Sequence, residues 1–350
     1  MDVKELFINS CKSALTVQNK NGSFQPGTNG PYNHEDTLVT NTARQSISFY
    51  KAYSMTGNKK FFVAGNKCMD SLLTKMNCPF GFTYKIRNTG FDKCNGVIGQ
   101  AIVIQALSFA YKVSNETKYL EEALRLFNLL PFNKATNLWE RIEIDGTNLG
   151  VDNTFNHQLA FVAYTIPLAQ ENKKVRNKLK LFLDNVENNL VLRNKKGLIR
   201  HFSKQKILGE IKYFLLNKYF RLADKLSNYE YKERGYHAYN MLLFAKLKQE
   251  FPDHNFWESN KYQRAREYFI SKEYEQIKET SNPFFEKADL FLAYHYHKVE
   301  NNHKKTKFYL QKYLEEHYDF EKMSMSKNSA DPDSSQALVY LLADFLDLDL

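Results

Sequence analysis

Residues 150–159 hold the densest group of side chains suited to chemistry. Asp152, Asn153, Asn156 and His157 lie close together there, at the start of a stretch with helical periodicity. An imidazole can move a proton near neutral pH, and amides can position sugar hydroxyl groups. Asp152 and His157 are therefore catalytic candidates, and the two asparagines are substrate-binding candidates. Capping and packing at a helix end is the competing interpretation.

A second group lies at residues 230–240, where Arg234, Tyr236, His237 and Asn240 open another helical stretch. Aromatic and hydrogen-bonding groups together suit stacking on sugar rings and positioning of their hydroxyl groups. Tyr236 is a catalytic candidate for proton transfer, and the other three are substrate-binding candidates. Packing of the tyrosines in the core is the alternative.

Residues 92–100 form a third group. Asn95 can cap a helix, and Gln100 faces the same end of that helix. Two glycines between them, Gly96 and Gly99, permit close approach of backbone or ligand, although helix–helix contact alone would also explain them. Asn95 and Gln100 are therefore substrate-binding candidates.

Acidic residues are spread over the expected loops, and hydrolysis of a glycosidic bond needs two of them placed across the sugar. They are Glu35, Asp36, Asp92, Glu140, Asp145, Asp152, Glu230, Asp331 and Asp333. We keep Asp92, Asp145 and Asp152 as catalytic candidates, although the sequence does not choose a pair.

Arg44 is a substrate-binding candidate on the helix expected to begin at Asp36. A guanidinium can bind a uronate carboxylate with two parallel hydrogen bonds. An ion pair with Asp36 or an adjacent acid explains Arg44 equally well.

Helical patterns follow one another along most of the chain. The window 174–190 carries an apolar stripe at three- and four-residue spacing, which is typical of an outer helix, whereas 97–111 is apolar nearly all round, as expected of an inner helix. We expect helices at 2–17, 36–56, 59–76, 95–113, 116–130, 153–170, 174–190, 207–225, 231–250, 256–271, 284–298, 303–318 and 333–347.

The connections between these helices alternate in length. Short turns can only join antiparallel neighbours, which makes helical hairpins. Long connections separate the hairpins, at 18–35, 77–94, 131–152, 191–230, 272–283 and 319–332. If the first helix pairs with the last, six hairpins close into an all-α fold, an (α/α)6 toroid, with every long loop at one end. Residues 1–350 then form a single domain.

Several long loops contain a short segment in which apolar and polar residues alternate. These segments, at 81–86, 138–144 and 197–202, predict short strands that rim a cleft. The longest loop, 191–230, is an insertion that contains an extra basic amphipathic helix, expected to pack on the barrel or to act as a lid.

Composition narrows the class of protein. The net charge of +10 favours anionic partners, but the lysines form no dense basic block, so we expect an acidic oligo- or polysaccharide and no nucleic acid. No run of about eighteen apolar residues and no signal-peptide pattern occurs, so we expect a cytoplasmic protein without a transmembrane segment. The cysteines show no metal-binding spacing, and neither a metal nor a cofactor is expected. Nothing in the sequence indicates the oligomeric state.

Three stretches together resemble the six-hairpin glycosidase-like proteins of surface-polysaccharide and glycosylation gene clusters. They are residues 95–101, 152–158 and 234–240. The superfamily includes unsaturated glucuronyl hydrolases, (α/α) polysaccharide lyases and glucuronyl C5-epimerases, so the resemblance implies a carbohydrate-active cleft. No residue here is matched to the single catalytic aspartate of the glucuronyl hydrolases.

These observations leave three functions open. The leading hypothesis is a glycoside hydrolase-like enzyme that acts on a bacterial surface polysaccharide or its precursor through paired loop carboxylates. The second is a uronate lyase or C5-epimerase, in which Tyr236 or His157 moves the C5 proton while Asn156, with Arg44 or Arg234, neutralises the substrate carboxylate. The third is a non-catalytic glycan-binding or scaffold protein.

Overall fold

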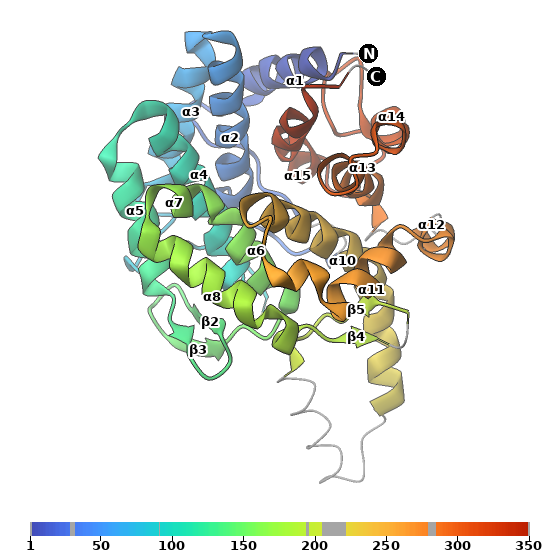
Figure 1. The fold of residues 1–350 in the computed structure, drawn as a ribbon. Coiled ribbons are helices and arrows are strands. Elements are labelled where there is room, and N and C mark those ends of the chain that lie inside the picture. Colours follow the sequence, from blue (N-terminus) through green and yellow to red (C-terminus); the bar gives the residue numbers. More distant parts are fainter. Residues whose placement is uncertain are drawn as a thin grey trace.

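The helices form two concentric layers in the computed structural model, which describes residues 2–28, 32–90, 92–193, 196–204, 222–278 and 285–348 (Figure 1). Within these residues the inner layer consists of α2 (Val39–Thr56), α4 (Gly96–Ser114), α6 (Phe155–Tyr164), α10 (Leu222–Glu250), α13 (Ala288–Lys298) and α15 (Pro332–Ala337), the last continued by the 3₁₀ helix η4 (Val339–Phe345). Each inner helix contacts the next, and η4 contacts α2, so the ring is closed.

The outer layer is formed by the second helix of each hairpin. Its described members are α1 (Val3–Val17), α3 (Lys59–Leu72), α5 (Thr117–Leu129), α8 (Lys173–Asn189), α11 (Asn260–Phe269) and α14 (His303–His317). The first outer helix, α1, packs on η4 near the other end of the chain, and the two termini lie close together in Figure 1. The (α/α)6 toroid predicted from the sequence is confirmed.

The inner helix α4 shows why this layer is apolar on all sides. It contacts α2 and α6 within the ring and α5 outside it, so Val97, Ile104 and Leu107 are all completely buried. Among the described residues, α4 is the one helix long and apolar enough to cross a membrane, and 72% of its most apolar window is buried inside the protein. Burial of that extent is typical of a core helix.

Short strands occur in two of the long connections. β1 (Phe132–Asn133), β2 (Leu138–Ile142) and β3 (Asn148–Val151) form an antiparallel sheet in that order, and β4 (Leu192–Arg193) pairs with β5 (Leu198–Ile199). The strands predicted at 138–144 and 197–202 are therefore confirmed. Residues 81–86 form no strand, and an isolated bridge joins the next residue, Arg87, to Asp36.

A recurring hydrogen bond attaches long connections to the inner helices that follow them. A side chain of the inner helix accepts the backbone N–H of a residue in the connection before it. In the part of the chain that the structure describes, these pairs are Thr42 with Phe24 (3.0 Å), Gln100 with Tyr84 (2.9 Å), Gln158 with Trp139 (2.9 Å), His237 with Ile199 (3.3 Å) and Gln336 with Met325 (2.8 Å). At these five inner helices a polar side chain therefore holds the loop and satisfies one of its backbone N–H groups.

Contacts between the long connections bring them to one end of the toroid. Thr37 N–H donates to Ile86 O at 2.7 Å, which joins the first connection to the second. The hydroxyl of Thr83 donates to Ile142 O at 3.2 Å, which joins the second to the third. Further contacts continue this chain of loops: Ser203 N–H donates to Asn153 O at 2.9 Å, and Thr28 N–H to Asp331 Oδ2 at 2.9 Å. Inner-helix residues of the first turns therefore face a common rim.

Some helix boundaries differ from those expected. The helix predicted at 153–170 ends at Tyr164, and α7 (Ile166–Glu171) follows, because Pro167 lacks the N–H needed to continue the first helix. The described part of α10 begins at Leu222, so the end of the predicted insertion 191–230 is helical. Of the extra helix predicted at 207–225, residues 207–221 lie outside the described residues.

The second half of the chain is more broken than its periodicity predicts. The helix expected at 256–271 begins as a 3₁₀ helix, η2 (Asn255–Glu258), and α11 restarts where the Ser259 side chain caps Tyr262 N–H. α12 (Lys272–Lys278) occupies a stretch expected to be a loop. Apolar periodicity of three and four residues does not distinguish a continuous α-helix from one with 3₁₀ turns.

Candidate functional site

Asp152, which is buried, and His157, which is partly exposed, form a pair at the loop end of the toroid. His157 Nδ1 lies 2.9 Å from Asp152 Oδ2, and the same carboxylate accepts Val97 N–H at 3.0 Å and Thr154 N–H at 3.1 Å. Burial raises the pKa of Asp152, but the imidazole and the backbone N–H groups outweigh it and hold that pKa at about 2. Asp152 is therefore an ionised hydrogen-bond acceptor at neutral pH.

This pairing fixes which nitrogen of His157 is basic. A carboxylate can only accept, so Nδ1 carries the proton that it donates to Asp152. In the neutral imidazole Nε2 is then the unprotonated nitrogen. No hydrogen-bond partner of Nε2 occurs among the described residues, and the side chain is 21% exposed. The arrangement provides a general base whose orientation is set by a carboxylate.

Gly96, the first residue of α4, lies against this pair. Its φ is +57°, and a Cβ there would lie 2.2 Å from Asp152 Oδ2 and 2.6 Å from His157 Nδ1. Such contacts are far closer than van der Waals packing permits. Only glycine lets α4 approach the pair, and this places Val97 N–H against the carboxylate.

We expect Gly96→Ala to lower turnover at least tenfold, because the methyl group would displace Asp152 or His157. Gly57→Ala is the matched control, since Gly57 also has a positive φ of +66°, but a Cβ there would meet nothing within 4 Å. The free energy of unfolding of both variants should fall by roughly 1–2 kcal/mol, because alanine is strained in a left-handed backbone conformation. Urea denaturation and turnover of the two variants check this. Equal turnover in both would show that the close approach of Gly96 to Asp152 and His157 does not affect turnover.

Arg87, which no sequence pattern singled out, lies next to Asn95 and Asp92. Its Nη2 donates to Asn95 Oδ1, on the residue before Gly96, and lies 3.9 Å from Asp92 Oδ1. The only signal in the sequence is its position directly after the segment 81–86 that was expected to rim the cleft. Its side chain is 12% exposed, so its charge acts in a site with little solvent.

Asp36 adds an acid that titrates near neutral pH. The residue is 5% exposed, and its Oδ1 has no hydrogen-bond partner among the described residues. Burial raises its pKa to about 7, even though the charges of Arg44 and Arg87 oppose the rise; Asp331 contributes to it. A carboxyl group with such a pKa can exchange a proton at physiological pH.

Arg44 lies on the lumen side of α2. Its charge acts on Asp36 and on the hydroxyl groups of Tyr239 on α10 and Tyr340 on η4. The guanidinium makes no hydrogen bond or ion pair with a residue that the structure describes, so the alternative of an ion pair with Asp36 or an adjacent acid finds no support among these residues. The guanidinium is left available for an anionic group of a ligand.

Tyr236 closes another side of this site. Its hydroxyl donates to Tyr32 at 2.9 Å, and its ring stacks on His201 with centroids 5.5 Å apart. Burial and the neighbouring Tyr32 raise the pKa of Tyr236 well above its usual value. Tyr236 is therefore a hydrogen-bond donor rather than a base at neutral pH.

Two of the acids selected from the sequence form hydrogen bonds with other parts of the protein. Asp92 accepts Gly96 N–H at 3.0 Å and Arg141 Nη1 at 3.3 Å. Asp145 lies in the turn between β2 and β3 and accepts Thr147 N–H at 2.9 Å. Both carboxylates therefore have structural partners, and the choice of a catalytic pair among the loop acids stays a prediction.

Among the substrate-binding candidates, Gln100 and His237 hold loops instead. Gln100 is completely buried and uses both ends of its amide on Tyr84 and Cys94. His237 is also completely buried, and burial, the largest effect, lowers its pKa to about 3. Both residues are therefore structural, a correction that follows from their burial between inner helix and rim loop.

The remaining asparagines divide into two kinds. Asn153 bonds Val151 O at 3.2 Å and Ser203 Oγ at 3.1 Å, so it fixes the rim. Asn156 on α6 and Asn240 on α10 are buried on neighbouring inner helices, and each has an Oδ1 without a hydrogen-bond partner among the described residues. Arg234 is engaged by Glu230 at 2.8 Å.

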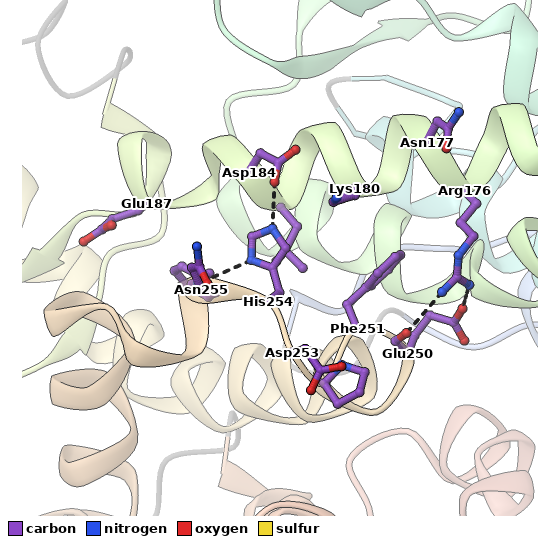
Figure 2. A pocket seen from close by; sticks show the side chains of 13 residues that line it. Arg176, Asn177, Lys180, Asp184, Glu187, Glu250, Phe251, Asp253, His254 and Asn255 are labelled. Carbon is purple, nitrogen blue, oxygen red and sulfur yellow. Dashed lines mark hydrogen bonds and ion pairs between the residues drawn. The ribbon is translucent and has the colours of Figure 1, made fainter.

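A separate surface cavity of about 680 Å³ lies between α8 and the turn that follows α10. Two ion pairs cross it in Figure 2: Arg176 pairs with Glu250, and Asp184 lies 2.8 Å from His254 Nε2. This cavity is on the side of the short turns and contains none of the candidate residues. Among the described residues no group of three His, Cys, Asp or Glu side chains could hold a metal ion.

The chain is similar to a glycosylation protein and to several enzymes of known structure that act on sugars. The chain is 32% identical over 303 residues to archaeal glycosylation protein Q of Haloferax volcanii, a match that covers 81% of this chain and 80% of that protein. This chain belongs to the family of archaeal glycosylation protein Q. No protein-family model matches the chain.

Solved structures share the fold of this glycosylation-protein family member. Cellobiose 2-epimerase from Bacillus thermoamylovorans has a TM-score of 0.63 at 12% identity over 98% of both chains. A D-mannose isomerase has a TM-score of 0.65 at 14% identity, over 98% of this chain and 97% of that one. An unsaturated glucuronyl hydrolase specific for heparin has a TM-score of 0.60 at 12% identity, over 99% and 98%. The resemblance to six-hairpin glycosidase-like proteins is confirmed.

Proposed function

We propose that this chain is a sugar epimerase or isomerase of glycan synthesis, with His157 as the base that removes a proton from carbon. The observation that carries the proposal is the pair in which Asp152 holds Nδ1 of His157 at 2.9 Å and leaves Nε2 without a partner among the described residues. Such a base suits abstraction of a weakly acidic proton next to a carbonyl or carboxylate group.

The reaction balances with groups of this chain alone. The C–H bond of the sugar breaks, its proton passes to Nε2, and its electron pair moves to the neighbouring oxygen. Asp152 stabilises the imidazolium, and the unpaired charge of Arg44 stabilises the oxygen that becomes negative. Return of a proton to the opposite face gives an epimer. Return to the neighbouring carbon, with transfer of the adjacent hydroxyl proton to the enolate oxygen, gives an isomer. Asp36, with its pKa of about 7, is suited to supply that proton.

The substrate class follows from charge and from the relatives. Arg44 and the net charge of +10 favour a sugar that carries a carboxylate. The relative in Haloferax volcanii is a glycosylation protein, and two structural neighbours are a cellobiose 2-epimerase and a D-mannose isomerase. We therefore propose an acidic sugar, or the end of an acidic glycan, that is used in glycosylation.

Incubation in D₂O tests the reaction type. Glucuronate, galacturonate, mannose and cellobiose are followed by ¹H NMR, and we expect enzyme-dependent loss of one C–H signal as deuterium enters the sugar carbon. His157→Gln should abolish the exchange. New reducing ends without deuterium at carbon would contradict the proposal, and so would ligand binding without any change of the sugar.

Hydrolysis is the second candidate because of Asp36. A carboxyl group with a pKa of about 7 is still protonated near neutral pH and can protonate a leaving group. An unsaturated glucuronyl hydrolase is among the structural neighbours. In that case Asp36→Asn would abolish the release of reducing ends, and no deuterium would enter the sugar from D₂O.

A further inference from the structure

A second cavity lies outside the central site, between α1, α2 and α15 and beneath the first and last long connections. Its volume is about 530 Å³, which is in the range of small-molecule sites. The walls combine apolar side chains with polar ones, most of them neutral and two of them charged, Lys322 and Asp333. They are Ser13, Val17, Phe24, Gln25, Asn41, Gln45, Lys322, Ser324, Ser326, Pro332, Asp333 and Gln336.

Three amide side chains of this cavity are incompletely hydrogen-bonded. Asn41 and Gln45 are each 1% exposed, and they use their N–H groups on Gln25 O at 2.9 Å and Gln336 O at 3.4 Å. Asn41 Oδ1, Gln45 Oε1 and Gln336 Nε2 have no partner among the described residues. Buried polar atoms in folded proteins are nearly always paired, so three exceptions around one cavity indicate a missing partner.

Comparison within the chain makes Gln336 the most informative of the three. Gln100 and Gln158 hold their loops in the same way, and in both the amide nitrogen also bonds a backbone oxygen. Gln336 accepts Met325 N–H at 2.8 Å, but its nitrogen has no partner among the described residues. The equivalent structural role is therefore complete at two inner helices and incomplete at the third, which borders the cavity.

We propose that this cavity binds a neutral pyranose ring. Two free acceptors and one free donor match sugar hydroxyl groups, each of which can donate and accept. Phe24 offers an aromatic ring for the C–H face of a sugar, and the terminal torsions of Asn and Gln are broad enough to turn the amides toward a ligand. Two carbonyl oxygens disfavour an anion. The site is independent of the reaction proposed above.

Methyl α-glucoside, methyl α-mannoside and methyl α-galactoside are suitable probes, with tetrahydropyran-2-methanol as the ring that lacks the other hydroxyl groups. Binding is measured by titration calorimetry and by the ¹³C-methyl signal of Met325, whose N–H bonds Gln336. We expect at least one glycoside to bind and to shift this signal, and the hydroxyl-poor ring not to. Absence of binding by every glycoside, or equal binding of the hydroxyl-poor ring, would overturn the proposal.

Variants locate the bound sugar. Gln45→Met keeps the shape but removes an acceptor, and we expect roughly fivefold weaker binding. Val17→Trp should fill the mouth and abolish binding, because Val17 is 60% exposed there, whereas Val63→Trp on α3, where the side chain is 51% exposed, should not. His157→Gln should leave this affinity unchanged. Loss of all binding in His157→Gln, with normal binding in Val17→Trp, would place the sugar in the central site and refute the proposal.

Discussion

Replacement of His157 by Gln is expected to lower turnover by roughly 10²–10⁴-fold, the usual contribution of a general base. Glutamine can keep a hydrogen bond to Asp152 but cannot accept a proton from carbon. The side chain is 21% exposed, so folding should be nearly unaffected. Turnover per folded molecule and the melting temperature of the variant check this expectation.

His254→Gln is the matched control for this experiment. His254 also pairs with an aspartate, at 2.8 Å from Asp184, but it lies on the side of the short turns. We expect its replacement to leave turnover unchanged. If His157→Gln lowered the melting temperature by several degrees and kept full turnover, His157 would have only a capping and packing role.

The sequence was sufficient for the ring of hairpins because the responsible forces are local or repeated. Apolar periodicity distinguished the outer α8 from the all-apolar inner α4, and loop lengths indicated the alternation of hairpins and long connections. The break between α6 and α7 coincides with Pro167, although apolar periodicity continues on both sides of it. The 3₁₀ turns of η2 and η4 have no such signal, since they arise from packing at the ends of neighbouring helices.

The candidate site was only partly predictable, because polar residues of the same type serve different purposes on successive helices. Gln100 and His237 follow the pattern expected of ligand-binding side chains, but they hold Tyr84 and Ile199 of the rim. Asp152 and His157 were selected together, and the structure pairs them. Arg87 was missed because its contact with Asn95 depends on the folded path of a loop.

The conversion of Asp36 into a group that titrates near neutral pH could not be read from the sequence either. Its raised pKa results from burial together with Asp331, a residue nearly three hundred positions away in the chain. Long-range desolvation of this kind exists only in the folded protein. The pKa of Asp36 therefore depends on the closure of the ring, which brings Asp331 near it, and not on any one sequence motif.

Asp344→Asn is expected to destabilise the protein by about 3 kcal/mol at pH 7, as for the loss of one member of a buried ion-pair cluster. Asp344 lies on η4 inside the ring and binds Lys51 Nζ at 3.0 Å and Lys246 Nζ at 3.1 Å. The three side chains are 14–20% exposed, so solvent screens them little. Asparagine would leave two ammonium groups facing each other without a counter-charge.

The stabilisation by Asp344 depends on pH. Burial raises the pKa of Asp344, but Lys246 and Lys51 outweigh it and hold that pKa well below the usual value. The folded state then binds fewer protons than the unfolded state between the two pKa values, so the stabilisation is fully present above about pH 4 and is lost as the pH falls further. Urea denaturation at pH 7 and pH 3 should show a smaller difference between Asp344→Asn and the unmodified protein at pH 3.

Two further variants separate electrostatics from packing. Asp253→Asn, at an exposed position after α10, should change stability by less than about 0.5 kcal/mol. Lys51→Met in the Asp344→Asn background should recover part of the loss, because it removes one of the two ammonium groups that would repel each other. No recovery, together with a loss that does not change between pH 7 and pH 3, would mean that Asp344 acts through shape alone. In that case the ion pairs of Asp344 would not be what holds η4 against α2 and α10.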